Sequence, residues 1–168
     1  MPRAAVLLTL LTFCACGYQM AGFSAGTSAA QAGNISYYLE EILNKSSNQT
    51  ITTDMQEYVN RFFSSYGSLR SKEDAIYNMV VALEEYSVTA ATISSSRDAV
   101  TLNLTAAYSF TITAADGRNL YRETIRRLQS FTPGSSVSEY NSNLEEAFIS
   151  ITDDIMSEFK NDFEISRR

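Results

Sequence analysis

The chain has 168 residues, carries 13 Lys and Arg against 19 Asp and Glu, and has a formal net charge of −6. This acidity argues against nucleic acid as a partner, because binding to phosphates requires clustered Lys and Arg. The sequence contains no histidine, which removes the usual general base, the commonest zinc ligand and every Ser-His or Cys-His nucleophile arrangement.

The N-terminal residues have the features of an export leader. Arg3 supplies a short positive region, and residues 4–13 form an apolar run that is too short to cross a bilayer core of about 30 Å as a helix. The only cysteines, Cys14 and Cys16, follow this run. A disulfide between them would close a very small strained ring, and the pair supplies two ligands where structural zinc takes four. The leader resembles a bacterial lipoprotein signal, in which a lipidated cysteine becomes the first mature residue.

Small residues are favoured just before the lipidated cysteine of such signals. Ala15 precedes Cys16, whereas bulky Phe13 precedes Cys14, so we expect Cys16 to carry the lipid and residues 1–15 to be the signal peptide. Phe13 departs from the Leu that is usual three positions before the cysteine. Gly17 resembles outer-membrane sorting, by analogy with enteric bacteria, where Asp at this place retains lipoproteins in the inner membrane. The alternative is an ordinary cleaved signal peptide whose cysteines are incidental.

Residues 16–33 are predicted to be the anchored N-terminus and a flexible spacer, since 24–33 are rich in Ser, Ala and Gly. The next segment, 34–43, is ambiguous. Its apolar residues fall on one face of a helix, but most of them also lie on one side of a strand that Glu41 interrupts. Periodicity slightly favours the helix.

A helix is predicted over residues 54–66. Thr53 and Gln56 have the spacing of a capping box, and Gly67 stands where a left-handed residue would end the helix. Its apolar stripe consists of Met55, Val59, Phe62 and Tyr66.

Three strands follow a polar loop at 68–75. They are predicted at 76–93, 99–114 and 119–131, the last two joined by an Asp116-Gly117 hairpin turn. The middle strand gives the clearest periodic signal in the chain, an alternation between apolar and polar residues. Its apolar side carries Val100, Leu102, Leu104, Ala106, Tyr108, Phe110 and Ile112; its other side carries Thr101, Asn103, Thr105, Ser109, Thr111 and Thr113.

A second amphipathic helix is predicted at about 139–162, after Pro133-Gly134 and a serine-rich loop. Its stripe consists of Leu144, Phe148, Ile151, Ile155 and Phe159. A sheet with one apolar face and two helices with one apolar stripe each can bury one another, which predicts a two-layer α+β sandwich. The polar face of the sheet is then left for water or a partner.

No set of catalytic residues is evident. Adjacent acidic residues occur at Glu40-Glu41, Glu84-Glu85, Glu145-Glu146 and Asp153-Asp154. Neighbours in a strand point to opposite faces, and neighbours in a helix diverge by about 100°, so these pairs should not converge for acid–base chemistry. Phosphate loops, zinc ligand sets and dinucleotide fingerprints are absent from the sequence. We therefore expect no enzyme activity, no metal and no cofactor.

One basic cluster stands out in this acidic chain. It consists of Arg97, Arg118, Arg122, Arg126 and Arg127. Even spacing would place Arg118, Arg122 and Arg126 on one side of the strand, where a cationic row suits anionic groups such as phosphorylated glycolipid. The alternative is cross-strand pairing with nearby glutamates: Glu84, Glu85 or Glu123.

The order of features resembles the LptE family of lipopolysaccharide-assembly lipoproteins. The matching features are Cys16-Gly17-Tyr18, Asn44-Lys45-Ser46 after an apolar strand, a helix, a meander with Asp116-Gly117, Phe131 after the last strand, and a C-terminal helix containing Glu145-Glu146-Ala147. Each motif alone is weak, and their order over nearly all of the mature chain carries the resemblance.

The resemblance implies that 34–43 is a strand, so that residues 34–168 form one domain with a mostly antiparallel or mixed four-stranded sheet packed on two helices. It also implies an outer-membrane lipoprotein that plugs the LptD barrel, helps it assemble and binds lipopolysaccharide without covalent chemistry. By location, Arg97, Arg118, Arg122 and Arg126 are the expected lipopolysaccharide contacts. The alternatives are a secretin pilotin and an auxiliary lipoprotein of a lipid ABC transporter.

Overall fold

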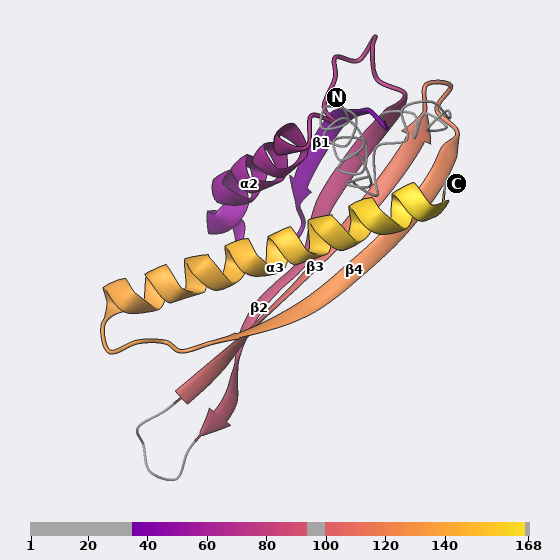
Figure 1. The fold of residues 1–168 in the computed structure, drawn as a ribbon. Coiled ribbons are helices and arrows are strands. Elements are labelled where there is room, and N and C mark those ends of the chain that lie inside the picture. Colours follow the sequence, from indigo (N-terminus) through magenta and orange to yellow (C-terminus); the bar gives the residue numbers. More distant parts are fainter. Residues whose placement is uncertain (1–34, 94–99, 167–168) are drawn as a thin grey trace, which may run out of the picture. The chain divides into compact units, whose positions relative to one another are not determined.

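The computed structural model describes residues 35–93 and 100–166. The predicted signal peptide and spacer, with Cys16, and also Arg97 lie outside the described residues. In chain order the elements are β1 (Tyr37–Asn44), a 3-10 turn η1 (Gln49–Ile51), α2 (Thr52–Ser65), β2 (Tyr77–Ile93), β3 (Val100–Ala114), β4 (Asn119–Phe131) and α3 (Val137–Ser166) (Figure 1).

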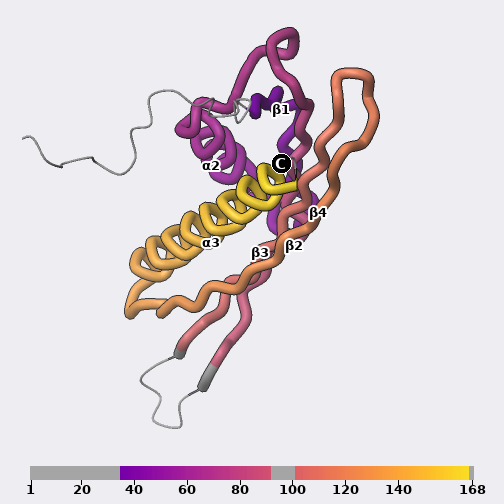
Figure 2. Tube along the Cα trace, turned by 45° about the vertical axis from the view of Figure 1, so that its right-hand side comes forward, coloured from indigo at the N-terminus to yellow at the C-terminus, as the bar shows by residue number. Residues whose placement is uncertain are grey.

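The four strands form one mixed sheet in the order β1-β2-β3-β4. β1 runs parallel to β2 and is connected to it through α2, whereas β2, β3 and β4 form an antiparallel meander. Beyond Ala90 and Leu102 the far ends of β2 and β3 pair only with each other among the described residues (Figure 2). The predicted α+β class and the four-stranded sheet on two helices are confirmed.

Residues 37–43 of this segment belong to strand β1, so the prediction from periodicity was wrong and the one from the resemblance was right. A β-bulge lies between Leu39 and Glu41, and its extra residue shifts the side chains that face the core from Tyr37 and Leu39 to Ile42. Leu39 and Ile42 are therefore three residues apart, which is also a spacing found on one face of a helix. Tyr37 is also bonded on its outer side, since its N–H donates to the Ser68 carbonyl at 2.8 Å.

Both helices lie on the same face of the sheet (Figure 1), and an aromatic core fills the space between the layers. Phe159 of α3 stacks on Phe110 of β3 with ring centroids 4.1 Å apart. Phe63 of α2 meets Tyr37 of β1 edge-on at 5.9 Å. One buried hydrogen bond joins the layers, between the hydroxyls of Tyr108 and Thr152 at 3.2 Å.

The predicted capping box at Thr53 is absent. The η1 turn continues directly into α2 at Thr52, so Thr53 is already inside the helix, and no side chain caps the helix at Ile51. The Gln56 side chain instead donates to the carbonyl of Ile42 at 3.2 Å. The predicted end of the helix at Gly67 is confirmed, since this residue has φ of 62° and its N–H donates to the Ser64 carbonyl at 2.9 Å.

A capping box does start α3. The Glu139 N–H donates to the Ser136 hydroxyl at 3.2 Å, and the Glu139 carboxylate accepts from the Ser135 N–H at 2.6 Å. Gly134, with φ of 78°, turns the chain next to Glu139. The helix is longer at both ends than the predicted 139–162, whereas β2, β3 and β4 match their predictions to within one residue.

The Asp116-Gly117 turn between β3 and β4 is also confirmed: Gly117 has φ of 81°, and its N–H donates to the Ala114 carbonyl at 2.9 Å. Within 35–93 and 100–166, neither helix combines the length and hydropathy needed to cross a membrane.

Candidate functional site

The face of the sheet opposite α2 and α3, called the open face here, carries most of the polar side chains of β3. Leu104, Tyr108 and Phe110 are fully buried toward the helices, so Thr105, Ser109 and Thr111 point the other way. By register, Thr111 stands opposite Arg122, Ser109 opposite Thr124, and Ala107 opposite Arg126. The open face therefore combines hydroxyls of β3 with guanidinium groups of β4.

Glu84 and Glu85 both lie on this face, although alternation predicted that they would point to opposite faces. A bulge between Leu83 and Glu85 adds one residue to β2, and a bulge lets consecutive side chains share a face. The Glu84 carboxylate accepts from the Ser109 hydroxyl at 2.6 Å, and the Glu85 carboxylate accepts from Arg126 Nη2 at 2.9 Å. The predicted placement of the two side chains on opposite faces was wrong because it assumed an uninterrupted strand.

Charges of opposite sign alternate across the open face in a set that we call the charged row: Lys45, Glu84, Glu85, Arg122 and Arg126. Lys45 Nζ lies 2.9 Å from Glu84 Oε1, and Arg126 pairs with Glu85. The hydrogen bond from Ser109 lowers the pKa of Glu84, and the charges of Lys45 and Arg122 lower it further, against the desolvation that burial imposes. Glu84 is thus held ionised near neutral pH, where it accepts hydrogen bonds and attracts cations.

The predicted basic residues are only partly gathered. Arg122 and Arg126 share the open face, and Arg126 follows the alternative prediction of cross-strand pairing. Arg118 lies in the hairpin turn, where its Nε is 3.8 Å from Asp116. A register shift opposite Ile112 and Thr113 interrupts the alternation of β4 between Arg118 and Arg122, so even spacing does not put the two on one side.

Arg127 points to the helix side and pairs with Glu158 of α3. Glu123, considered as a partner for the arginines, also lies on that side, where it accepts from the Tyr121 hydroxyl. Arg127 thus links β4 to α3, and Glu123 bonds to a neighbour within β4. Neither residue belongs to the charged row.

The contacts of Glu84 with Ser109 and Lys45 were not predicted. Glu84 was considered only as a partner of the arginines, Ser109 only as a polar residue of the strand, and Lys45 only within a motif of the resemblance. The spacing of the large apolar residues of β2 could have indicated the bulge. The core residues Met79, Val81 and Leu83 are two apart, and the next one, Tyr86, follows after three. That change marks an inserted residue. Among the described residues, no group of three or more Asp, Glu, Cys or His side chains is placed to hold a metal ion.

The fold and the open face together define the class: an α+β protein whose mixed four-stranded sheet is covered by two helices on one side and presents a polar, charged surface on the other. No protein-family model and no curated protein matches the chain. Similar proteins are found only among solved structures.

A presumed lipoprotein from Caulobacter crescentus has a TM-score of 0.52 with 8% identity, over 74% of this chain and 88% of that chain. Rare lipoprotein B from Shewanella oneidensis has a TM-score of 0.49 with 14% identity, over 76% of this chain and 99% of that one. A minor lipoprotein from Acinetobacter baumannii has a TM-score of 0.47 with 16% identity, over 76% and 94%. At these identities the likeness concerns the fold alone, and of the three only the Caulobacter crescentus protein has a TM-score above 0.5.

Proposed function

We propose that this chain is an outer-membrane lipoprotein, anchored through Cys16, that plugs the LptD barrel and helps it assemble for lipopolysaccharide transport. The observation that carries the proposal is the open face, which offers the hydroxyls of β3 and charges of both signs from Lys45 to Arg126. Support also comes from the lipoprotein-like leader, from the LptE-like order of motifs, and from the fold shared with a presumed lipoprotein.

The proposed role depends on the contrast between the two faces of the sheet. The lumen of a large outer-membrane barrel is polar, and a surface that enters it must provide hydrogen-bonding groups rather than apolar ones. The charged row and the β3 hydroxyls provide such groups, while α2 and α3 keep the aromatic core dry on the other side. Such a plug acts by binding alone, which agrees with the proposal that the protein is not an enzyme.

Lipopolysaccharide binding is the second part of the proposal, with Arg97, Arg118, Arg122 and Arg126 as contacts. Guanidinium groups bind phosphate through paired charge-assisted hydrogen bonds. Among the described residues, Arg122 makes no ion pair shorter than 4 Å, whereas Arg126 is already paired with Glu85. Arg122 is therefore the better placed of the two for a phosphate group.

The test is to extract the full chain from membranes in detergent, with a photo-crosslinking amino acid at Thr124 on the open face. We expect LptD to co-purify and to be crosslinked from Thr124. Glu57, exposed on α2, is the matched control position and should give no lumen crosslink. Mass spectrometry of the same preparation reports whether the chain begins at a lipidated Cys16.

Recovery of the chain without LptD would refute the plug role. Recovery of a secretin or of a lipid-transporter subunit would replace it with one of the two alternative accessory functions. A crosslink to LptD that is as strong from Glu57 as from Thr124 would contradict the role of the open face while leaving the partner in place.

A further inference from the structure

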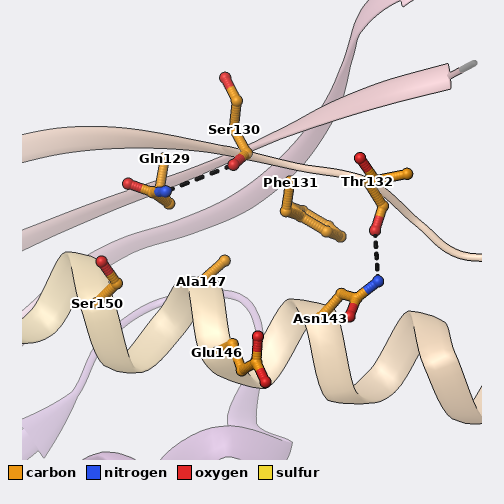
Figure 3. Close-up of a pocket in the computed structure, with 8 residues that line it drawn as sticks. All are labelled: Gln129, Ser130, Phe131, Thr132, Asn143, Glu146, Ala147 and Ser150. Carbon is orange, nitrogen blue, oxygen red and sulfur yellow. Dashed lines mark hydrogen bonds between the residues drawn. The ribbon is translucent and has the colours of Figure 1, made fainter.

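A hollow of about 490 Å³ lies between the end of β4 and the N-terminal half of α3 (Figure 3). This volume lies within the range of small-molecule sites. The strand side is formed by residues 129–132, and the helix side by Asn143, Glu146, Ala147 and Ser150. We call it the polar groove; it is on the helix side of the sheet and is separate from the open face.

Two side-chain carboxamides, those of Gln129 and Asn143, line the groove; their nitrogens are hydrogen-bonded and, among the described residues, their oxygens are not. Asn143 Nδ2 donates to the Thr132 carbonyl at 2.8 Å, and Gln129 Nε2 approaches the Ser130 carbonyl at 3.4 Å (Figure 3). Neither side-chain oxygen, Oδ1 of Asn143 or Oε1 of Gln129, accepts a hydrogen bond from the described residues. The carboxylate of Glu146 and the hydroxyl of Ser150 are likewise without a hydrogen-bond partner in the described part of the chain.

The floor of the groove is apolar. Phe131 and Ala147 face each other from the strand and the helix and are 8% and 6% exposed (Figure 3). Ser130 contributes its carbonyl to the lining, because its hydroxyl is turned to the open face, where it donates to Asn103 at 2.8 Å. The groove is thus a small apolar floor with acceptor-rich side chains around it.

The chemistry of this lining selects among ligands. No Lys or Arg lines the groove, so nothing there would neutralise a phosphate or a carboxylate. Two carboxamide oxygens, a carboxylate and a hydroxyl instead suit a ligand that donates several hydrogen bonds from neighbouring atoms. Adjacent hydroxyls on a ring meet this need, and the C–H face of the ring fits an apolar floor. We propose that the polar groove binds an uncharged saccharide.

The inference is independent of the proposed plug role, because no residue of the charged row lines the groove. The probes are maltose and diacetylchitobiose, titrated into the full chain in a detergent without a sugar headgroup. The readout is the NMR signals of the side-chain amides of Gln129 and Asn143. We expect saturable shifts of both signals with at least one disaccharide, and none with inorganic phosphate.

Variants locate the binding. Gln129→Ala combined with Asn143→Ala removes two neutral hydrogen-bonding groups and should weaken binding about tenfold or more. Because this variant lacks the two side-chain amides, its binding is followed in the backbone amide signals of Ala147 and Ser150, which also line the groove. Glu146→Gln, which keeps the size of the side chain, should also weaken it. Asn141→Ala is the matched control, because Asn141 is exposed on the same helix and makes no hydrogen bond to the described residues; it should bind as the parent does.

The inference fails if neither disaccharide shifts the two amide signals, or if Asn141→Ala weakens binding as much as the double variant of Gln129 and Asn143 does. It also fails if an uncharged tripeptide such as N-acetyl-trialanine amide shifts these signals while both disaccharides leave them unchanged. In all of these cases co-purification with LptD is unaffected, so the two proposals are tested separately.

Discussion

Glu84 shows how a single carboxylate makes a polar sheet face compatible with burial. Ser109 is only 8% exposed on the middle strand, where an unsatisfied hydroxyl would be costly. The Glu84 carboxylate accepts a hydrogen bond from the Ser109 hydroxyl at 2.6 Å and another from Lys45 Nζ at 2.9 Å. One residue therefore connects β1, β2 and β3 on the open face, which explains why a charged side chain is placed at the bulge.

Replacing Glu84 with Gln should change how stability depends on pH. The folded state holds the Glu84 pKa below its usual 4.5, so the stabilisation by the carboxylate is complete above about pH 4.5 and is lost as the pH falls through the lowered value. We expect Glu84→Gln to cost up to about 1 kcal/mol at pH 7, as for partly exposed charge pairs, and less under acid conditions. Urea unfolding at pH 7 and pH 3 measures both differences.

The control is the same substitution in a Ser109→Ala background, which forms a double-mutant cycle. Because the hydrogen bond from Ser109 is the largest cause of the lowered pKa, most of the pH-dependent difference should vanish there. A difference between Glu84→Gln and the parent that stays constant from pH 7 to pH 3 would contradict this account.

At the scale of elements, bulges explain why some of the fold could be predicted from the sequence and some could not. The uninterrupted alternation of β3 was sufficient to locate the strand and its buried face. In β1 and β2 an inserted residue changes the spacing of core side chains from two to three, at Leu39 to Ile42 and at Leu83 to Tyr86. A step of three is also a helical step, so local periodicity cannot separate the two possibilities; strand pairing decides between them.

The candidate site depends on the same feature. Arg122 and Arg126 could be assigned to one face from their even spacing, but their partners are set by cross-strand register, which the sequence of one strand does not contain. The polar groove was not predicted at all, because its residues come from a strand end and from a helix 11 residues further along, joined by the bond between Asn143 and Thr132.

The start of α3 gives a prediction for helix capping. Ser136→Ala removes the hydroxyl that accepts from the Glu139 N–H, and loss of an N-cap of this kind costs about 1 kcal/mol. Ser138→Ala is the control, since Ser138 is exposed in the first turn without a hydrogen-bond partner among the described residues, and Ala favours the helix. Urea midpoints should fall for the first variant only. Equal midpoints would show that the Glu139 carboxylate caps the helix without Ser136.

At the scale of the whole described domain, the two faces of the sheet carry different kinds of side chain. The helix side is an aromatic core in which rings from five elements meet: Tyr37 of β1, Phe63 of α2, Phe110 of β3, Tyr121 of β4 and Phe159 of α3. The open face carries the charged row and no comparable cluster of aromatic rings among the described residues. If the proposed plug role is right, the contact with LptD lies on the side of the sheet opposite the aromatic core, so changes in the core should leave that contact intact.

Phe159 tests this division, because it is fully buried and its ring contacts aromatic rings from β1, α2, β3 and β4. Phe159→Ala should lower the free energy of unfolding by about 3–5 kcal/mol, through lost burial and the cavity left behind. Phe159→Leu fills part of that cavity and should cost less. Ile165→Ala, on the same helix but 67% exposed, should change stability by no more than about 0.5 kcal/mol.

Urea unfolding of the three variants gives these values, and crosslinking from Thr124 then tells whether the two sides are independent. As long as Phe159→Leu remains folded, it should crosslink to LptD as the parent does, because none of the ring contacts of Phe159 reaches the open face. A folded Phe159→Leu variant that loses the crosslink would mean that the helix layer takes part in recognition. A loss of under about 1.5 kcal/mol in Phe159→Ala would mean that the core can close around the missing ring, as only a loosely packed core can.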